Sequence, residues 1–278
     1  MLYRAHTPGP PLNDFVDNLW LYDGYTTPHY KERIMPSGTI ELVINLHENE
    51  LRIYDAVQPD RCERFPGALI SGAYRGFFVS DTAEEASIMG VHFKPGGAFP
   101  FLGATPGEIA DTHLDLETLW GPSAVELREQ LCAATTPLER FRLLEAALVA
   151  RLFRPVEHHY AVSLALDAFE IPLSVRDVAR RIGLSQRRFI QIFTAEIGMT
   201  PKLFCRVRRF QRVLAFVRQR TAVDWATLAI DCGYFDQSHL IRDFRAFSGF
   251  SPADFLRHQN DLIQRRVHIK HNHLPLIV

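Results

Sequence analysis

The 278-residue chain has few of the features that mark several protein classes. Its four cysteines lie far apart and form no Cys-x-x-Cys pair, so neither a disulfide scaffold nor a cysteine zinc site is expected. It has no run of the roughly 20 apolar residues that a membrane-spanning helix needs, and its N-terminus has no apolar core of signal-peptide length. These absences predict a protein of the reducing cytoplasm with no membrane partner.

The chain as a whole has almost no excess of either charge, because its net charge is −1. The charges are nevertheless unevenly distributed. Residues 155–278 contain 18 Lys and Arg against 11 Asp and Glu, a net charge of +7, whereas the preceding residues contain 13 against 21, a net charge of −8. A cationic C-terminal part indicates a polyanionic partner for that part alone. The alternative is a basic face that is merely solvated.

The first hundred residues have the pattern of β-strands. Segment 40–46 places apolar side chains at every second position, and a turn separates it from a second short strand at 51–54. Further apolar runs follow, with Pro and Gly between them at intervals typical of a sandwich or barrel, at 68–70, 77–79 and 88–93. We therefore predict a β-rich domain over residues 1–104.

The period of the pattern changes near residue 105. Thr105 and Thr136 each begin a capping box with proline at the first helical position. The second box opens an amphipathic helix whose apolar stripe runs from Leu138 to Leu152. We predict a helical connector over residues 105–155, which packs on a domain of its own chain or on its twin in a homodimer, through the helices of residues 123–153.

A repeat in the C-terminal part is the most informative feature of the sequence. Segment 175–183 recurs as segment 225–233, and in each copy apolar residues share one helical face, an alanine permits close packing and a glycine ends the helix. A second helix follows each copy, capped by Ser185 or by Asp236. This arrangement predicts two helix-turn-helix units in an all-α domain over residues 156–260. The remaining tail, 261–278, shows no periodicity.

The exposed side chains of the two second helices indicate what these helices bind. Phe189 and Phe193, spaced by four residues, would lock the first of them onto its partner, so the other positions face outward. Arg, Gln and Ser side chains read base edges in a major groove. Segments 186–193 and 237–244 contain no Glu or Lys, which a plain bundle surface would show in pairs. The outward positions are Gln186, Arg187, Ile190 and Gln191, followed by Gln237, Ser238, His239 and Arg242.

A single helix is predicted between the two units. Residues 201–217 have one apolar stripe and would span about 25 Å. Such a helix could hold the units on successive major-groove faces, one turn of DNA apart. The candidates for phosphate contacts are Gln186, Arg206, Arg208, Arg209 and Arg212. The alternative is that the arginines only solvate a connecting helix.

On these residues the C-terminal part resembles the AraC/XylS family of bacterial transcription regulators, over about residues 156–260. The resemblance rests on segment 183–193, on segment 233–244 and on Gly249, Ser251 and Pro252. It implies a two-motif unit that binds asymmetric promoter DNA, with RNA polymerase as a further partner. The base-reading positions that it implies are Arg187, Ile190, Gln191, Gln237, Ser238, His239 and Arg242.

The first helix departs from the pattern of the family. Many relatives have Gln and Arg where this chain has Ile190 and Gln191. The first unit is therefore expected to read its site more by apolar contact with thymine methyl groups. For the same reason the target sequence of a relative cannot be transferred to this chain.

The N-terminal part is similar to the sensor domains of some of these regulators, over segments 36–42, 71–72 and 90–98. Such domains are cupin-like β structures that bind effectors or mediate dimerisation. Candidates for lining an effector cavity combine aromatic surface with polar groups, and they are Trp20, Tyr22, Arg75 and His92. The alternative is that these four residues are ordinary core or surface residues.

Metal chemistry is weakly indicated. His29, His47 and His92 could be ligands in a cupin-like barrel, but they lack the tight His-x-His spacing of such sites. In the tail, His271 and His273 could bind metal adventitiously. The sequence therefore predicts no metal, no cofactor and no enzymatic activity.

The leading interpretation is an α+β protein that regulates transcription, controlled by a small molecule in a cupin-like N-terminal domain. One alternative is a metal-dependent cupin-type enzyme with a helical targeting module. The other is an N-terminal domain that only pairs subunits or contacts proteins.

Overall fold

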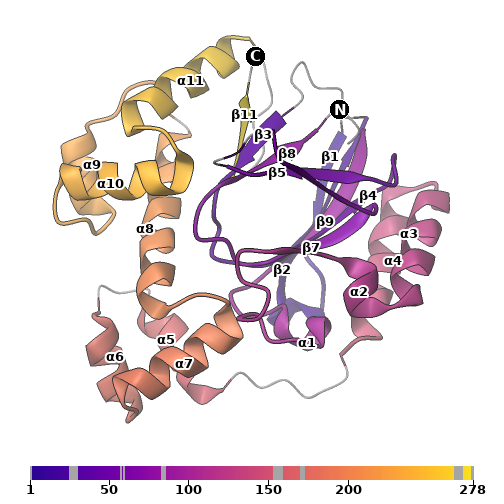
Figure 1. The fold of residues 1–278 in the computed structure, drawn as a ribbon, viewed down its shortest axis with the longest axis horizontal. Helices are drawn as coiled ribbons and strands as arrows, with labels where there is room; N and C mark the ends of the chain where they lie inside the picture. Colours follow the sequence, from indigo (N-terminus) through magenta and orange to yellow (C-terminus); the bar gives the residue numbers. More distant parts are fainter. Residues whose placement is uncertain are drawn as a thin grey trace.

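The structure is a computed structural model that describes residues 2–24, 31–56, 58, 60–82, 86–152, 159–169, 173–218, 220–265 and 272–276. Two β-sheets form the N-terminal domain and a group of helices forms the C-terminal domain (Figure 1). The α+β prediction is confirmed. None of the described helices combines the length and the apolar composition that a bilayer span requires.

The N-terminal domain contains two antiparallel sheets, here given in their spatial order. The first consists of β1 (Leu2–His6), β2 (Val16–Asp23), β9 (Ser87–Phe93), β4 (Glu41–Asn45), β7 (Ala68–Ser71) and β10 (His113–Asp115). The second consists of β11 (His273–Leu276), β3 (Lys31–Ile34), β8 (Phe78–Asp81), β5 (Leu51–Tyr54) and β6 (Cys62–Phe65). Neither sheet closes on itself within the described residues, so the arrangement is a sandwich rather than a barrel.

The alternating segments of the sequence are all strands of these sheets, namely β4, β5, β7, β8 and β9. The sequence pattern did not predict β1, β2, β3, β6 and β10. Strand β2 shows the reason, because Leu19, Trp20, Leu21 and Tyr22 are all buried. A strand that is buried on both faces does not alternate.

The tail contributes a strand to the N-terminal domain, although its sequence predicts no regular structure. Strand β11 pairs antiparallel with β3, with His273 opposite Ile34. The backbone of Met35 also donates to the carbonyl of Asn272 at 2.9 Å. An edge strand such as β3 has unpaired backbone groups that a further strand satisfies. Leu274 is then fully buried, which fixes the register.

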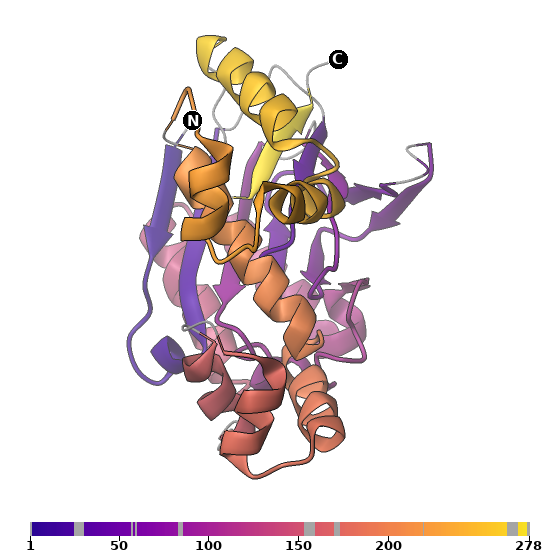
Figure 2. The same ribbon diagram turned by 90° about the vertical axis from the view of Figure 1, so that its left-hand side faces the viewer.

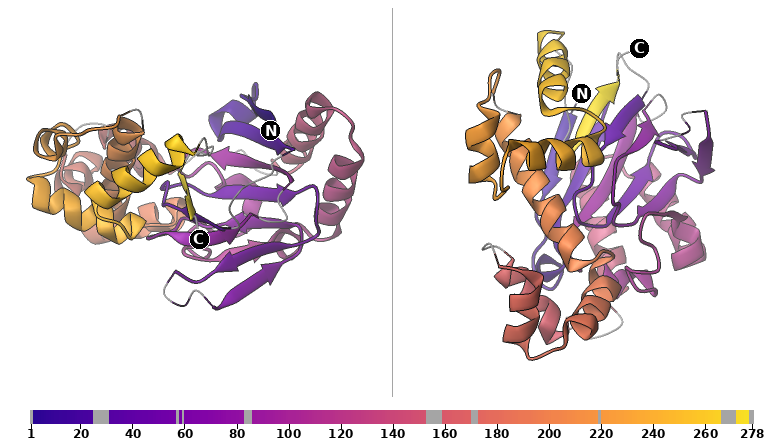
Figure 3. Two further views of the ribbon diagram at one scale, coloured as in Figure 1. Left: turned by 90° about the horizontal axis from the view of Figure 1, so that it is seen from above. Right: turned by 60° about the vertical axis from the view of Figure 1, so that its left-hand side comes forward.

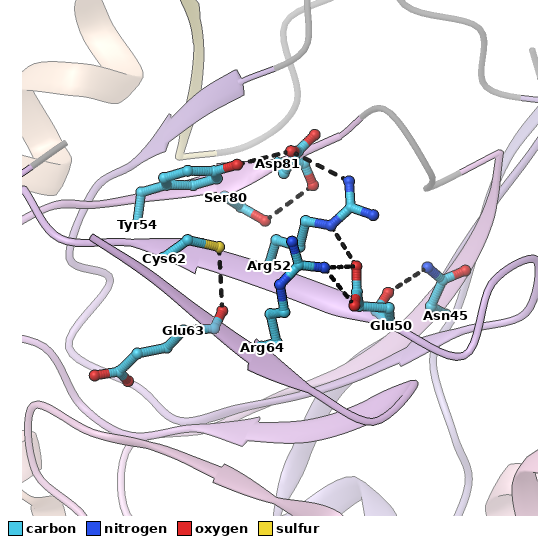
Figure 4. A network of polar contacts seen from close by, with 9 residues as sticks. All are labelled: Asn45, Glu50, Arg52, Tyr54, Cys62, Glu63, Arg64, Ser80 and Asp81. Carbon is cyan, nitrogen blue, oxygen red and sulfur yellow. Dashed lines mark hydrogen bonds and ion pairs between the residues drawn. The ribbon is translucent and has the colours of Figure 1, made fainter. Parts of the chain in front are cut away.

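The polar network of Figure 4 ties the strands of the second sheet together. The Glu50 carboxylate accepts hydrogen bonds from Arg64, at 2.7 Å, and from Arg52. Arg52 lies 3.7 Å from Asp81, and the Tyr54 hydroxyl donates to the same carboxylate at 3.2 Å. Partly exposed ion pairs of this kind are individually weak. Together they join β5 to β6 and to β8.

Helix α1 (Phe99–Leu102) lies before the predicted connector of residues 105–155. The connector contains α2 (Leu116–Trp120), α3 (Pro122–Ala133) and α4 (Pro137–Val149), but also β10, which pairs with β7 of the first sheet and was not expected there. The Thr136 hydroxyl accepts from Glu139 N at 3.2 Å, which is one of the two hydrogen bonds of the second predicted capping box. The first box also has one of its two, from Thr105 N to the Glu108 carboxylate at 2.8 Å, but turns follow it instead of a helix. The backbone N–H of Gly107 donates to Ala195 of the C-terminal domain.

The C-terminal domain consists of α5 (Tyr160–Ala168), α6 (Val175–Ile182), α7 (Gln186–Ile197), α8 (Pro201–Val217), α9 (Trp225–Asp231), α10 (Gln237–Ser248) and α11 (Pro252–Gln264). Figures 1 and 2 show α8 running between the two groups of helices, one at each of its ends. Figures 1 and 3 place the domain on the side of the sheets opposite to α3 and α4. The expected domain boundary near residue 155 lies outside the described residues.

Helix α8 joins the cores of the two units. Near its start, Phe204 packs on Phe193 of α7, with ring centroids 5.6 Å apart. Further along, Phe210 contacts Phe244 and Phe247 of α10, both at 5.2 Å. All five rings are at most 3% exposed, so both units are fixed to one helix by well-packed aromatic contacts.

Candidate functional site

Helices α7 and α10, hereafter the recognition helices, begin and end in the same way. The Ser185 hydroxyl accepts from Arg188 N at 3.3 Å, and the Asp236 carboxylate accepts from His239 N at 2.7 Å. Both helices end at a glycine in the left-handed region, Gly198 with φ 86° and Gly249 with φ 73°. These caps are the ones that the repeat predicts, because capping depends on local sequence.

The predicted base-reading residues of α7 lie on its exposed side. Gln186, Arg187 and Gln191 are exposed, and Ile190 is half-buried. Phe189 and Phe193 are fully buried, as their spacing predicts. The side chains available for direct contact on this helix are therefore one guanidinium and two amides, with an apolar edge from Ile190.

In α10, Gln237, Ser238 and Arg242 are exposed. His239 differs from them, since its ring packs against Tyr234 with centroids 5.1 Å apart and its Nε2 lies 4.0 Å from a carboxylate oxygen of Asp243. The structure thus brings three of the four predicted residues to the surface and turns the fourth partly toward the interior.

The arginines of α8 do not share one face. Arg206 donates to a carboxylate oxygen of Asp243 from Nε at 3.0 Å and from Nη2 at 2.7 Å, and Arg209 lies 3.8 Å from the other oxygen. Arg208 and Arg212 instead line a cleft between the domains. Positions 206 and 208 lie two residues apart, which places them on opposite sides of a helix.

An open groove of about 620 Å³ runs beside the recognition helix of the second unit. It extends from Ser174, the N-cap of α6, across Lys202 of α8 to Arg242. Phe235 lies on this groove and is 87% exposed. Arg206 and Arg209 also line it, as do Asp236 and Asp243. Four cationic side chains from α8 and α10 therefore face the groove against two carboxylates, and an excess of positive charge favours an anionic partner.

The cleft that contains Arg208 and Arg212 has a volume of about 610 Å³. On the side of the N-terminal domain it is lined by Lys94, Asp17 and His92, among other residues. Charges of both signs therefore meet there, and these two arginines face the N-terminal domain rather than the groove.

A more enclosed cavity lies inside the N-terminal domain. Trp20, Tyr22 and His92 line it, as three of the four predicted effector residues. Arg75 does not, because its side chain is 71% exposed and pairs with Asp111. The cavity has a volume of about 70 Å³, which is room for several water molecules at about 10–15 Å³ each. A ligand with a benzene ring needs about 150 Å³, so its binding requires the wall of the cavity to move.

Two histidines of this cavity have opposite electrostatic environments. Burial lowers the pKa of His92, but the neighbouring Glu41 carboxylate, 2.9 Å away, more than offsets this, so the pKa lies above its ordinary value. Burial lowers the pKa of His113 to about 3, which keeps this ring uncharged. His92 is therefore favoured in its protonated form, paired with the Glu41 carboxylate, whereas His113 is an uncharged hydrogen-bonding group.

Of the histidines considered as metal ligands, His92 and His273 line the same cavity, but each pairs with its own carboxylate, Glu41 or Glu32. His47 is exposed after β4. His29 and His271 lie outside the described residues. The described part of the chain contains no group of three His, Cys, Asp or Glu side chains placed to hold a metal ion.

Sequence reasoning missed four residues of these sites. Asp243 had a signal, because it is the one acid in segment 237–244 and follows His239 by four residues. Phe235 also had one, as a large apolar residue directly before a cap. His113 and His273 had none, since only the pairing of distant strands brings them to the cavity.

Two families match parts of the chain. Residues 178–258 match a family described as a helix-turn-helix domain, and residues 4–115 match a domain of unknown function, DUF6597. The first match confirms the prediction of an AraC-type helix-turn-helix domain in a DNA-binding regulator. No curated protein matches the chain.

Among solved structures, the chain is similar to ToxT from Vibrio cholerae. A structure at 1.65 Å resolution shares 7% identity, with 92% of this chain and 98% of that chain covered and a TM-score of 0.46. Wild-type ToxT with bound unsaturated fatty acid shares 9% identity, with 86% and 94% covered and a TM-score of 0.45. ToxT bound to (E)-4-(8-methylnaphthalen-1-yl)but-3-enoic acid shares 7%, with 92% and 99% covered and a TM-score of 0.48.

Proposed function

We propose that this chain, an AraC-type helix-turn-helix transcription regulator, reads double-stranded promoter DNA with α7 and α10 and is controlled by a small molecule in the cavity of its N-terminal domain. The observation that carries the proposal is the matched pair of recognition helices. Both have exposed Arg and amide side chains, and both are fixed to α8 by buried aromatic residues.

Within this proposal the exposed side chains divide into two groups. Base edges are read by Arg187, Gln191, Gln237, Ser238 and Arg242, with Ile190 against thymine methyl groups and His239 in a secondary place. Phosphates are contacted by Gln186 and by Lys202, Arg206 and Arg209 of the groove. Arg208 and Arg212 act at the cleft between the domains rather than on DNA.

The cavity is the proposed effector site. Trp20, Tyr22 and His92 supply aromatic surface and polar groups, which is the usual composition of a small-molecule site. The proposal gives the chain no catalytic role. Purified protein is expected to contain no stoichiometric iron, zinc or manganese, and finding one of them would favour the cupin-type enzyme instead.

The remaining partners follow from this function. A promoter-bound regulator contacts RNA polymerase and acts in the bacterial cytoplasm, where its DNA lies. A homodimer would form through α3 and α4, which expose Val125, Leu138 and Val149. Mass measurement in solution tests this, because a monomer at micromolar concentration would exclude it.

DNA recognition is tested with duplexes that the full-length protein selects from a random-sequence pool. Arg187→Ala and Arg242→Ala should each weaken binding to the selected duplex by about 1–3 kcal/mol and relax the preference at one position. Arg142→Ala is the matched control, because Arg142 is an exposed arginine of α4. Failure of the pool to yield any sequence preference, with the protein folded, would refute the proposal.

A further inference from the structure

One loop of the N-terminal domain contacts the C-terminal ends of both recognition helices. Residues 72–77 connect β7 to β8. At Gly198, the end of α7, an added Cβ atom would lie only 3.0 Å from Cβ of Ala73. At Gly249, the end of α10, it would lie 2.7 Å from the ring of Phe77. The loop therefore packs directly on the backbone of both helices.

The same loop is attached to the cavity at both of its ends. Ser71 comes directly before it and Phe78 directly after it, and both side chains line the cavity. In the middle of the loop, the Tyr74 hydroxyl hydrogen-bonds to Nδ1 of His113. The other ring nitrogen of His113 lies 3.3 Å from Oγ of Ser71, and Phe78 packs edge-on against the ring at 4.5 Å. A change at this wall of the cavity thus reaches the loop through three contacts.

The lining of the cavity favours an uncharged ligand. None of the described lining residues is Lys or Arg. Of its histidines, His92 pairs with Glu41 at 2.9 Å, His273 pairs with the buried Glu32 at 2.7 Å, and His113 is neutral. A ligand carboxylate would therefore be buried without a free cation, which is costly.

The indole N–H of Trp20 indicates that the ligand has an oxygen atom. Trp20 is 7% exposed, and its indole N–H has no hydrogen-bond partner among the residues that the structure describes. A buried donor without a partner costs free energy that an acceptor would recover. Aromatic and aliphatic side chains, among them Tyr22, Phe78 and Leu69, form much of the rest of the wall. Ser71, Ser80 and Glu41 add polar groups to it.

We propose that the cavity takes an uncharged, mainly aromatic compound with one hydroxyl or carbonyl oxygen, and that its binding acts on both recognition helices through residues 72–77. This inference rests on the proposed function, since it names the ligand class and the route of regulation of the proposed effector site. A loop that holds the ends of α7 and α10 together sets their separation, and a ligand that favours one position of the loop shifts both helices.

The ligand class is tested by calorimetry without DNA, with 4-methylphenol and 4-methylbenzoate as probes of equal ring size and different charge. The phenol should bind at least about tenfold more tightly. Val43→Phe, which fills the cavity, should abolish this binding, whereas Ile230→Phe on the surface of α9 should leave it unchanged. Tighter binding of the benzoate, or unchanged binding in a folded Val43→Phe protein, would overturn the ligand class.

The route is tested by hydrogen exchange in full-length protein, again without DNA. Saturating 4-methylphenol should change the exchange rates of peptides containing Gly198 and Gly249 by at least about threefold. Tyr74→Phe removes the hydroxyl contact with His113 and should keep the binding of the phenol but lose both changes. Tyr54→Phe is the matched control, because its hydroxyl contacts Asp81 outside this route.

The outcomes separate this inference from the function on which it rests. Equal responses in wild type and Tyr74→Phe, or a response at only one of the two glycines, would overturn the route through residues 72–77. Absence of sequence-specific DNA binding refutes the proposed function and does not alter either result, because both measurements are made without DNA.

Discussion

The two helix-turn-helix units have the same plan but are attached to the N-terminal domain in different ways. In the first unit the backbone makes the attachment, since Gly107 N donates to Ala195 O at 3.1 Å and Gly198 lies against Ala73 and Pro106. In the second unit side chains make it. Arg33 of β3 donates to the carbonyl of Ser248 at 2.8 Å, and His258 of α11 contacts the carbonyl of Pro275 at 2.7 Å.

The difference indicates which unit is the more adjustable. Contacts between backbone atoms have no rotamers to change, so a shift of the first unit requires movement of the chain around it. A side chain such as that of Arg33 can change its rotamer while its guanidinium group keeps the hydrogen bond to the Ser248 carbonyl. The repeat has thus kept its caps and aromatic packing in both copies, while the contacts outside each unit have diverged.

The largest effect is expected from glycine substitutions at matched helix ends. Gly183→Ala should cost about 1 kcal/mol of unfolding free energy, because φ is 78° and the space around it is open. Gly249→Ala should cost about 2 kcal/mol, since it also displaces the mobile ends of Phe77 and Arg33. Gly198→Ala should cost about 3 kcal/mol, because Ala73 Cβ and the Pro106 carbonyl cannot rotate away.

Urea unfolding of the three variants measures this order. Equal losses of unfolding free energy in Gly198→Ala and Gly249→Ala would show that the contacts around the two glycines do not differ in rigidity. Gly183→Ala serves as the reference for backbone strain alone.

A smaller effect is expected from the ion pair that only the second unit contains. Asp243 is 3% exposed and pairs with Arg206 and Arg209. Asp243→Ala should lower the unfolding free energy by about 2 kcal/mol, since it removes charged hydrogen bonds and leaves two partly buried guanidinium groups without their acceptor. Asp177→Ala removes the exposed pair with Arg180 in the first unit and should change stability little. A comparable loss in both variants would contradict the expected difference.

The smallest effect is expected from a change of pH, and it concerns His113. This histidine hydrogen-bonds to Tyr74 of the loop 72–77, and the same loop contacts Gly198 of the first unit. The pKa of His113 is about 3 in the folded chain and about 6.5 when unfolded. As pH falls below about 6.5, the unfolded chain binds a proton that the folded chain does not, so stability falls. Between pH 7.5 and 5.5 the unfolding free energy of the His113→Gln protein should therefore fall by about 1 kcal/mol less than that of the wild type.

Unfolding in urea at the two pH values checks this expectation. His92, with its raised pKa, contributes in the opposite direction, because its ion pair is lost as pH rises. It is present in both proteins, so their difference isolates His113. An equal loss in both would exclude a neutral buried His113.

The features predicted best from the sequence are those that depend on residues close to one another in the chain, namely helix caps and the exposed faces of helices. Ser185 and Asp236 cap the helices that they were expected to cap, because a cap depends on the three residues after it. The exposed positions of α7 and α10 follow in the same way from the spacing of Phe189 and Phe193 and of their counterparts. These local rules were enough to identify the two units and most of their surface.

Contacts between distant parts of the chain were not accessible to such reasoning. Arg206 and Arg209 remain proposed phosphate contacts, but their pairing with Asp243 was not predicted, because it depends on how α10 packs on α8. Trp20, Tyr22 and His92 reach one cavity because the pairing of β2, β9 and β4 decides which side chains share a face. Arg75 does not reach it, because it lies in the loop of residues 72–77 and pairs with Asp111. The periodicity of one strand shows which of its side chains share a face, but it does not show which distant strand it pairs with.

Strand β11 has a consequence for the order in which the protein is made. Its His273 is 241 residues downstream of Glu32, the residue of β3 with which it pairs. A nascent chain on the ribosome therefore exposes the edge of β3, and leaves Glu32 without that partner, until both helix-turn-helix units have been translated. Edges of this kind attract other strands. Chaperone capture of the growing chain should accordingly persist until late in synthesis.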